Sequence, residues 1–104
     1  MASQLTREVG MDIKDYLLVC ISEESGEIAQ AVGKSLRFGL LDKNPITNAI
    51  NWLELRKEIH DLIAVYEMFC DEFDRVETLD RRLIDEKKNK VLNYMDYSES
   101  IGRL

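Results

Sequence analysis

Two pairs of acidic residues stand in segments whose neighbours are mostly apolar. Glu24 and Glu27 form one pair, Glu58 and Asp61 the other, and in each pair the residues are three positions apart. In a helix that spacing places the two side chains side by side. Buried carboxylates without partners are costly and repel one another, and a hard divalent cation such as Mg²⁺ or Mn²⁺ relieves both problems. The pattern therefore predicts a four-carboxylate metal centre.

The first acidic pair lies on the buried face of a long predicted helix, about residues 12–38, which ends before Gly39. Each helical residue advances about 100° around the axis. Apolar residues share the line of Glu24 and Glu27 on that helix: Ile13, Leu17, Cys20, Ala31 and Phe38.

A second long helix is predicted over about residues 48–73, after a loop over about residues 40–47. Glu58 lies within its apolar stripe, and Asp61 lies at the edge. The rest of that stripe is Asn51, Leu55, Leu62, Val65, Phe69 and Phe73. The residues predicted to face water are Arg56, His60, Glu67 and Asp71.

A third helix is predicted over about residues 78–97, with Thr78 as its N-cap and a loose tail from Ser98. A short helical turn is expected before Gly10. The inward face of the third helix combines apolar and basic residues: Leu83, Lys87, Lys90, Val91 and Tyr94. For both lysines two interpretations are open, namely binding of an anion or extension of the amine to the surface over an apolar stem.

The single histidine argues against a di-iron centre. Di-iron bundles use Glu-x-x-His motifs, whereas His60 follows Glu58 by two residues and points about 200° away from it. An all-oxygen cluster indicates Mg²⁺ and phosphate chemistry instead.

Composition limits the remaining classes. The chain has 104 residues, which predicts a single domain over residues 1–104. Its net charge of −6 disfavours binding to nucleic acid polymers. We find no apolar run long enough for a membrane span and no signal sequence. The two cysteines, Cys20 and Cys70, are expected to be free thiols in a reducing cytoplasm.

The acidic motifs resemble those of a known family. Glu23-Glu24-Ser25-Gly26-Glu27, followed by Glu58-Ile59-His60-Asp61, is similar to the EExxE…ExxD pattern of the MazG-like all-α nucleoside triphosphate pyrophosphohydrolases. The likeness extends over about residues 15–98. It includes the stretch from Lys34 to Gly39, Asp42, Pro45, the stretch from Asn51 to Glu58 and the stretch from Lys87 to Ser98.

The resemblance implies hydrolysis of a nucleoside triphosphate between its α and β phosphates, in a house-cleaning or similar role. Glu24, Glu27, Glu58 and Asp61 would be the catalytic residues and would hold one or two Mg²⁺ ions. A further set would contact substrate: Lys34, Arg37, Asn51, Lys87 and Lys90.

Several of these roles have structural alternatives. Glu23 is either an outer-shell residue of the metal centre or an exposed helix residue. Lys34 and Arg37 either bind phosphates or complement the C-terminal end of their helix. Asn51 either reads a sugar or base or caps a helix that begins later than residue 48.

Two other functions are open from the sequence. One is a non-catalytic helical interaction protein, whose acids pair with basic residues of another chain. The other is a metal-stabilised nucleotide sensor that binds without turnover.

The apolar arcs of both long helices are wider than one neighbour can cover. The first arc continues through Leu18, Ile21, Ile28, Val32 and Leu36, and the second continues through Trp52, Ile59, Ile63 and Cys70. A helix packed on one face needs an apolar arc of only roughly 100°. We therefore expect an all-α helical bundle in which two long helices and a third C-terminal helix complete a four-helix core by dimerisation. The expected assembly is a homodimer or a dimer of dimers, that is, a homotetramer.

Overall fold

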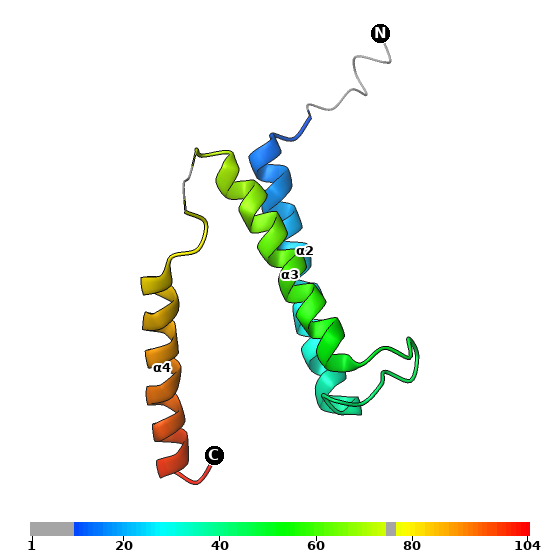
Figure 1. Cartoon of the computed structure of the whole chain (residues 1–104), viewed down its shortest axis with the longest axis vertical. Helices are drawn as coiled ribbons and strands as arrows, with labels where there is room; N and C mark the ends of the chain where they lie inside the picture. The colour runs from blue at the N-terminus through cyan, green and yellow to red at the C-terminus, as the bar shows by residue number, and fades with distance from the viewer. Residues whose placement is uncertain (1–9, 75–76) are drawn as a thin grey trace.

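The structure is a computed structural model that describes residues 10–74 and 77–104. These residues form the helices α2 (Ile13–Phe38), α3 (Asn51–Asp71) and α4 (Arg81–Ser100), and they include no β-strand. The predicted all-α fold is thus confirmed. Helices α2 and α3 run antiparallel as a hairpin, and α4 stands apart from them (Figure 1). The helical turn predicted before Gly10 lies outside the described residues.

Helix α2 begins and ends close to where the sequence predicts. The Asp12 side chain accepts a hydrogen bond from the backbone N–H of Lys14 and caps the first turn. Gly39 ends the helix with a φ of 94°, a conformation that favours glycine. A Cβ atom there would lie 2.7 Å from Oδ2 of Asp42, so both the backbone and the space select glycine.

The predicted starts of the other two helices are wrong. Helix α3 begins at Asn51 rather than near residue 48, because Asn48 adopts a left-handed φ of 62°. Helix α4 begins at Arg81, since the Asp80 carboxylate, rather than Thr78, accepts hydrogen bonds from the first-turn N–H groups of Arg82 and Leu83. Helix α4 also continues to Ser100, so the tail predicted to be loose from residue 98 is helical at its start.

Two buried asparagines close the loop between α2 and α3. Asn44 is 0% exposed and Asn51 is 1% exposed. The Asn51 side-chain amide donates to the carbonyl oxygen of Gly39 at 2.8 Å, and its backbone N–H donates to that of Asp42 at 3.0 Å. The Asn44 side chain accepts from the N–H of Ile46, while the backbone N–H of Asn44 donates to the carbonyl oxygen of Ala49. These bonds tie the end of α2 to the start of α3.

The core between α2 and α3 is small. Its buried apolar residues are Leu17, Ala31 and Cys70, and Ser35 packs beside them with its hydroxyl donating to the carbonyl oxygen of Ala31. The middle of the predicted α3 stripe is half-buried as expected: Leu55, Leu62, Val65 and Phe69. The stripes are wrong at the open end of the hairpin, where Ile13 and Phe73 are exposed and no other described helix packs against α2 and α3.

Helix α4 makes no contact with α2 or α3 among the described residues. None of its residues is buried, so the prediction that Leu83, Lys87 and Lys90 face the interior fails within one chain. The Cα radius of gyration is 19.4 Å, whereas a compact domain of this length has about 13 Å. None of the described helices has the length and apolar character that crossing a membrane requires.

Much of the surplus apolar surface expected from the sequence is exposed on the hairpin. On α2, Leu18, Val32 and Leu36 are exposed, and on α3 so are Trp52 and Ile59. The other members of that set are half-buried (Ile21, Ile28 and Ile63) or buried (Cys70). One chain therefore leaves an extensive apolar surface in contact with solvent.

The buried amide of Asn51 yields a prediction about stability. Asn51→Ala removes the 2.8 Å hydrogen bond to the carbonyl oxygen of Gly39 and leaves that oxygen only the longer bond from the N–H of Asp42, 3.3 Å, at an expected cost of about 1–1.5 kcal/mol in the free energy of unfolding. Urea unfolding followed by circular dichroism measures this. Asn89→Ala, at an exposed position of α4, is the control and should change the free energy by no more than about 0.5 kcal/mol. Equal stability of the two variants would contradict the role given to Asn51.

Candidate metal centre

The α2–α3 packing brings three of the four predicted acids together. One carboxylate oxygen from each of Glu24, Glu58 and Asp61 lies within 4.8 Å of the other two. Glu24 comes from α2, and the other two come from adjacent turns of α3. All three residues are half-buried. Residues far apart in the sequence thus form one cluster of oxygen donors, which we call the acidic triad.

Glu27 lies outside the triad. Its side chain is exposed, and it borders a hollow of about 250 Å³ next to Glu58. The complete lining of that hollow is Glu27, Gln30, Ala31, Lys34, Glu54, Lys57 and Glu58. The hollow therefore places two more predicted site residues, Glu27 and Lys34, at the edge of the cluster.

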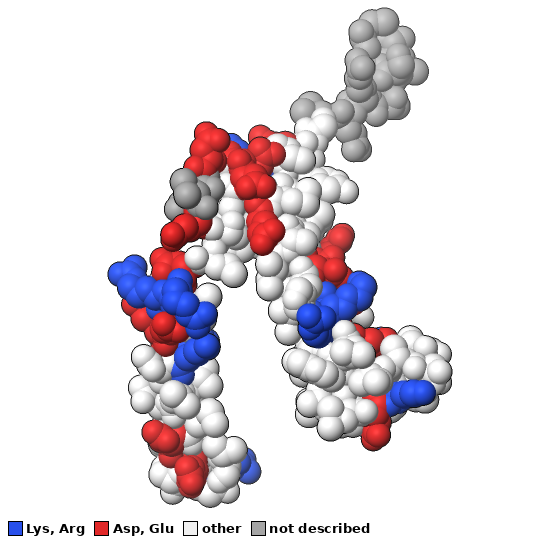
Figure 2. Space-filling model, in the orientation of Figure 1, with Lys and Arg blue, Asp and Glu red and all other residues white. Residues whose placement is uncertain are grey.

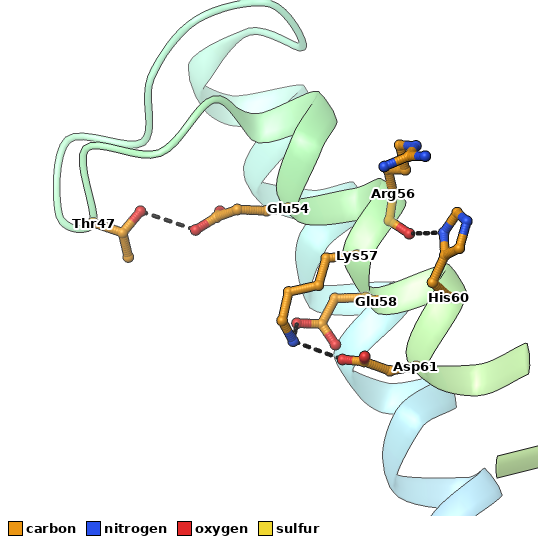
Figure 3. Close-up of polar contacts among 7 residues, drawn as sticks. All are labelled: Thr47, Glu54, Arg56, Lys57, Glu58, His60 and Asp61. Carbon is orange, nitrogen blue, oxygen red and sulfur yellow. Dashed lines mark hydrogen bonds and ion pairs between the residues drawn. The ribbon is translucent and has the colours of Figure 1, made fainter. Parts of the chain in front are cut away.

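Lys57 is a residue of this cluster that the sequence did not reveal. Its ammonium nitrogen lies 2.7 Å from Oδ2 of Asp61 and 4.0 Å from Oε1 of Glu58 (Figure 3). The spacing of Lys57 and Asp61, four residues apart in a helix, is the signal that could have revealed this contact. The hydrogen bond to Asp61 and the charges of Asp61 and Glu58 raise the pKa of Lys57. The chain thus supplies a cation of its own next to two carboxylates of the triad.

Glu24, the α2 member of the triad, has a raised pKa. Burial raises its pKa first, and repulsion from Asp61, Glu58 and Glu27 raises it further, whereas Lys57 opposes the shift. Its Oε2 atom is buried and accepts no hydrogen bond from any residue that the structure describes. A carboxylate oxygen in this position can serve as a ligand to a cation, so the triad can hold a metal ion.

The remaining predicted site residues lie away from the triad or serve the fold. Glu23 and Arg37 are exposed, and the Arg37 guanidinium lies 5.2 Å from the centre of the Phe38 ring. Asn51 is buried in the loop closure described above. Lys87 and Lys90 are exposed on α4, away from the hairpin.

His60 faces solvent, as predicted. Its Nδ1–H donates to the carbonyl oxygen of Arg56 at 2.7 Å, on the side of α3 away from the triad (Figure 3). The acidic triad therefore contains no imidazole ligand.

No protein family, curated protein or solved structure was found to match this chain.

The raised pKa of Glu24 predicts a pH-dependent effect on stability. The folded chain holds this proton more tightly than the unfolded chain, whose carboxyl titrates near 4.5. Ionised Glu24 therefore lowers stability at neutral pH, and the deficit disappears as the pH falls through the raised pKa towards 4.5. In EDTA at pH 7, Glu24→Gln should melt at a higher temperature than the parent, and the difference should shrink with acidification.

Glu23→Gln is the matched control, since it removes the same charge from the neighbouring exposed position. It should leave the melting temperature nearly unchanged over the same pH range. A Glu24→Gln variant that melts below the parent at pH 7 would mean that Glu24 belongs to a stabilising ion pair.

Proposed function

We propose that this chain is a Mg²⁺-dependent nucleoside triphosphate pyrophosphohydrolase of the MazG-like all-α type, with Mn²⁺ as a possible substitute. The observation that carries the proposal is the convergence of Glu24 with Glu58 and Asp61 across the hairpin. These residues belong to the two acidic motifs on which the family resemblance rests. Three oxygen donors and no imidazole suit a hard divalent cation.

The proposed reaction cleaves the bond between the α-phosphorus and the oxygen that bridges it to the β-phosphorus. A water oxygen bonds to the α-phosphorus, and the products are a nucleoside monophosphate and pyrophosphate. Mg²⁺, when bound, supplies positive charge to the phosphates and acidifies a water. Glu24, Glu58 and Asp61 would hold it, and Glu27, which borders the hollow beside Glu58, would receive the proton that the water loses.

The hollow beside Glu58 is the proposed place for part of the substrate. It borders the triad and includes Lys34, whose ammonium can neutralise a phosphate. Lys57 also lines it, and this residue would exchange its carboxylate partners for phosphate oxygens when substrate binds. Arg37, exposed one turn beyond Lys34, is a weaker candidate for the same task.

Self-association is part of the proposal. The exposed apolar faces of α2, α3 and α4 are too extensive for a stable monomer, and a homodimer or a dimer of dimers would cover them. A cytoplasmic house-cleaning role, in which unwanted nucleotides are hydrolysed, is consistent with two free cysteines.

Pyrophosphate release tests the activity. The chain should release pyrophosphate from at least one ribo- or deoxyribonucleoside triphosphate when millimolar Mg²⁺ or Mn²⁺ is present, and EDTA should abolish the release. Glu58→Gln should lower kcat/KM at least about 100-fold, because it removes a metal ligand. Glu67→Gln removes the same charge from an exposed position on the opposite side of α3 and should keep full activity.

Other outcomes would redirect the assignment. Inorganic phosphate as the sole product would exclude cleavage between the α and β phosphates. Nucleotide binding with Mg²⁺-dependent stabilisation but without turnover would identify a sensor. No response to metal or nucleotide would leave the interaction-protein alternative.

The contact between Lys57 and Asp61 predicts the metal affinity of a variant. Because the ammonium competes with a cation for the same carboxylates, Lys57→Gln should bind Mn²⁺ roughly two- to fivefold more tightly. Arg56→Gln removes a positive charge from the adjacent residue, which faces away from the triad, and should leave the affinity unchanged. Titration calorimetry with Mn²⁺ measures both, and equal affinities of the two variants would count against a metal site at the triad.

A further inference from the structure

Helix α4 is amphipathic, yet nothing in its own chain covers its apolar face. At about 100° per residue, Leu83, Val91, Tyr94, Tyr97 and Ile101 fall on one side of the helix. Their exposed fractions run from 42% to 63%. The opposite side carries mostly polar residues, Asp85, Asn89, Asn93, Asp96 and Ser100, with Leu92 as the apolar exception. Such a division is typical of a helix that packs against a partner.

Two lysines lie within the apolar stripe itself. Lys87 and Lys90 fall between the directions of Val91 and Tyr97, whereas Lys88 points away from the stripe. Figure 2 shows Lys and Arg side chains gathered over the N-terminal half of α4. If a partner covers the stripe, these two ammonium groups lose solvent and need anionic groups opposite them.

The α2–α3 hairpin offers the complementary surface. On the side where the triad borders the hollow, it exposes apolar side chains on both helices, Tyr16 on α2 and Met68 on α3. At about 100° per residue, Tyr16 falls on the same side of α2 as Glu27, and Met68 falls on the same side of α3 as Asp61. Between its helices lies the acidic triad, where Lys57 is the single cation within 4.0 Å of the carboxylates among the described residues. Helix α4 has 20 residues and α3 has 21, so both are about 30 Å long and can lie side by side.

We propose that α4 docks on the α2–α3 hairpin of a second copy of this chain, and that Lys87 and Lys90 there face the acidic triad. Each copy would then complete the centre of the other. The docking stands on apolar and charge complementarity alone, while the assignment of the two lysines to substrate phosphates rests on the proposed function.

The exposed area favours a second copy as the occupant. The chain exposes 8805 Å², whereas a compact protein of its mass exposes about 6,000 Å². The difference of about 2,800 Å² exceeds the roughly 800 Å² that each partner contributes to an interface of standard size. A single α4 folded back over the triad of its own hairpin would leave the opposite apolar face of the hairpin exposed, which carries Leu18, Val32, Trp52 and Ile59. In a dimer whose two copies exchange α4, the two hairpins also contact each other, and this contact area adds to the area that each α4 buries.

Zero-length cross-linking of the unmodified chain tests the docking without any substrate. Equal amounts of ¹⁴N- and ¹⁵N-labelled chain are unfolded together, refolded in EDTA and treated with a carbodiimide, which joins touching amines and carboxylates. We expect Lys87 and Lys90 to be linked to Glu24, Glu58 or Asp61. About half of the linked peptide pairs should contain both isotopes, as random pairing in a symmetric dimer requires. Lys88, adjacent in sequence but off the stripe, should form no such link.

Links of Lys87 and Lys90 in which both peptides always carry the same isotope would overturn the proposal, because they would show α4 closing on its own hairpin. The absence of links between α4 and the triad would also overturn it. Neither result depends on catalysis, so mixed-isotope links together with a failed pyrophosphate assay would keep the docking and reject the proposed function.

A matched pair of substitutions gives a second measurement. Tyr94→Asp places a charge in the stripe, whereas Leu92→Asp places the same charge on another side of α4, at a residue of similar exposure, 55% against 62%. Neither side chain packs on α2 or α3 of its own chain among the described residues, so neither change should disturb the hairpin. In sedimentation at micromolar concentration, Tyr94→Asp should raise the dissociation constant of the dimer at least tenfold and Leu92→Asp less than threefold. A compact, folded monomer of the parent chain, or equal effects of the two variants, would refute the interface.

Discussion

The antiparallel packing of α2 against α3 is the tertiary contact on which the rest of the described structure depends. It is the sole contact between helices in residues 10–74 and 77–104. It buries little apolar area, with Leu17, Ala31 and Cys70 as its buried apolar residues. Although the α2–α3 contact buries little area, it forms the candidate site, because it sets Glu24 opposite Glu58 and Asp61. A small contact thus positions every oxygen donor of the centre.

The same contact carries an electrostatic cost. Burial raises the pKa of Glu24, repulsion from the carboxylates that the hairpin brings near it raises that pKa further, and the charge of Lys57 offsets only part of the shift. Repulsion of this kind weakens the hairpin in the absence of a cation and strengthens the binding of one. Stability and affinity for a cation are therefore two aspects of one arrangement of charges.

The sequence predicted what depends on local periodicity. The extent of α2, its end at Gly39 and the side of α3 that faces α2 follow from spacing along one chain segment, and so does the pairing of acids across the hairpin. What it missed depends on three-dimensional detail. The exclusion of Glu27 from the triad reflects the rotation of α2 against α3, and the contact of Lys57 depends on a side-chain conformation. Asn51 acts through backbone groups of Gly39 and Asp42, which no residue pattern encodes.

The closed loop between α2 and α3 has a consequence for chain length. One residue added to α3 ahead of Glu58 would advance the helix by about 1.5 Å and turn everything beyond it by about 100°. Glu58 and Asp61 would then rotate away from Glu24, or the hydrogen bonds of Asn51 to the loop would break. The triad thus fixes the number of helical residues between the loop and its two α3 carboxylates, those of Glu58 and Asp61. Between Glu24 and Glu58, insertions therefore fit in the exposed loop between α2 and α3 rather than in the helices themselves, so the triad limits where this stretch of the chain can change in length.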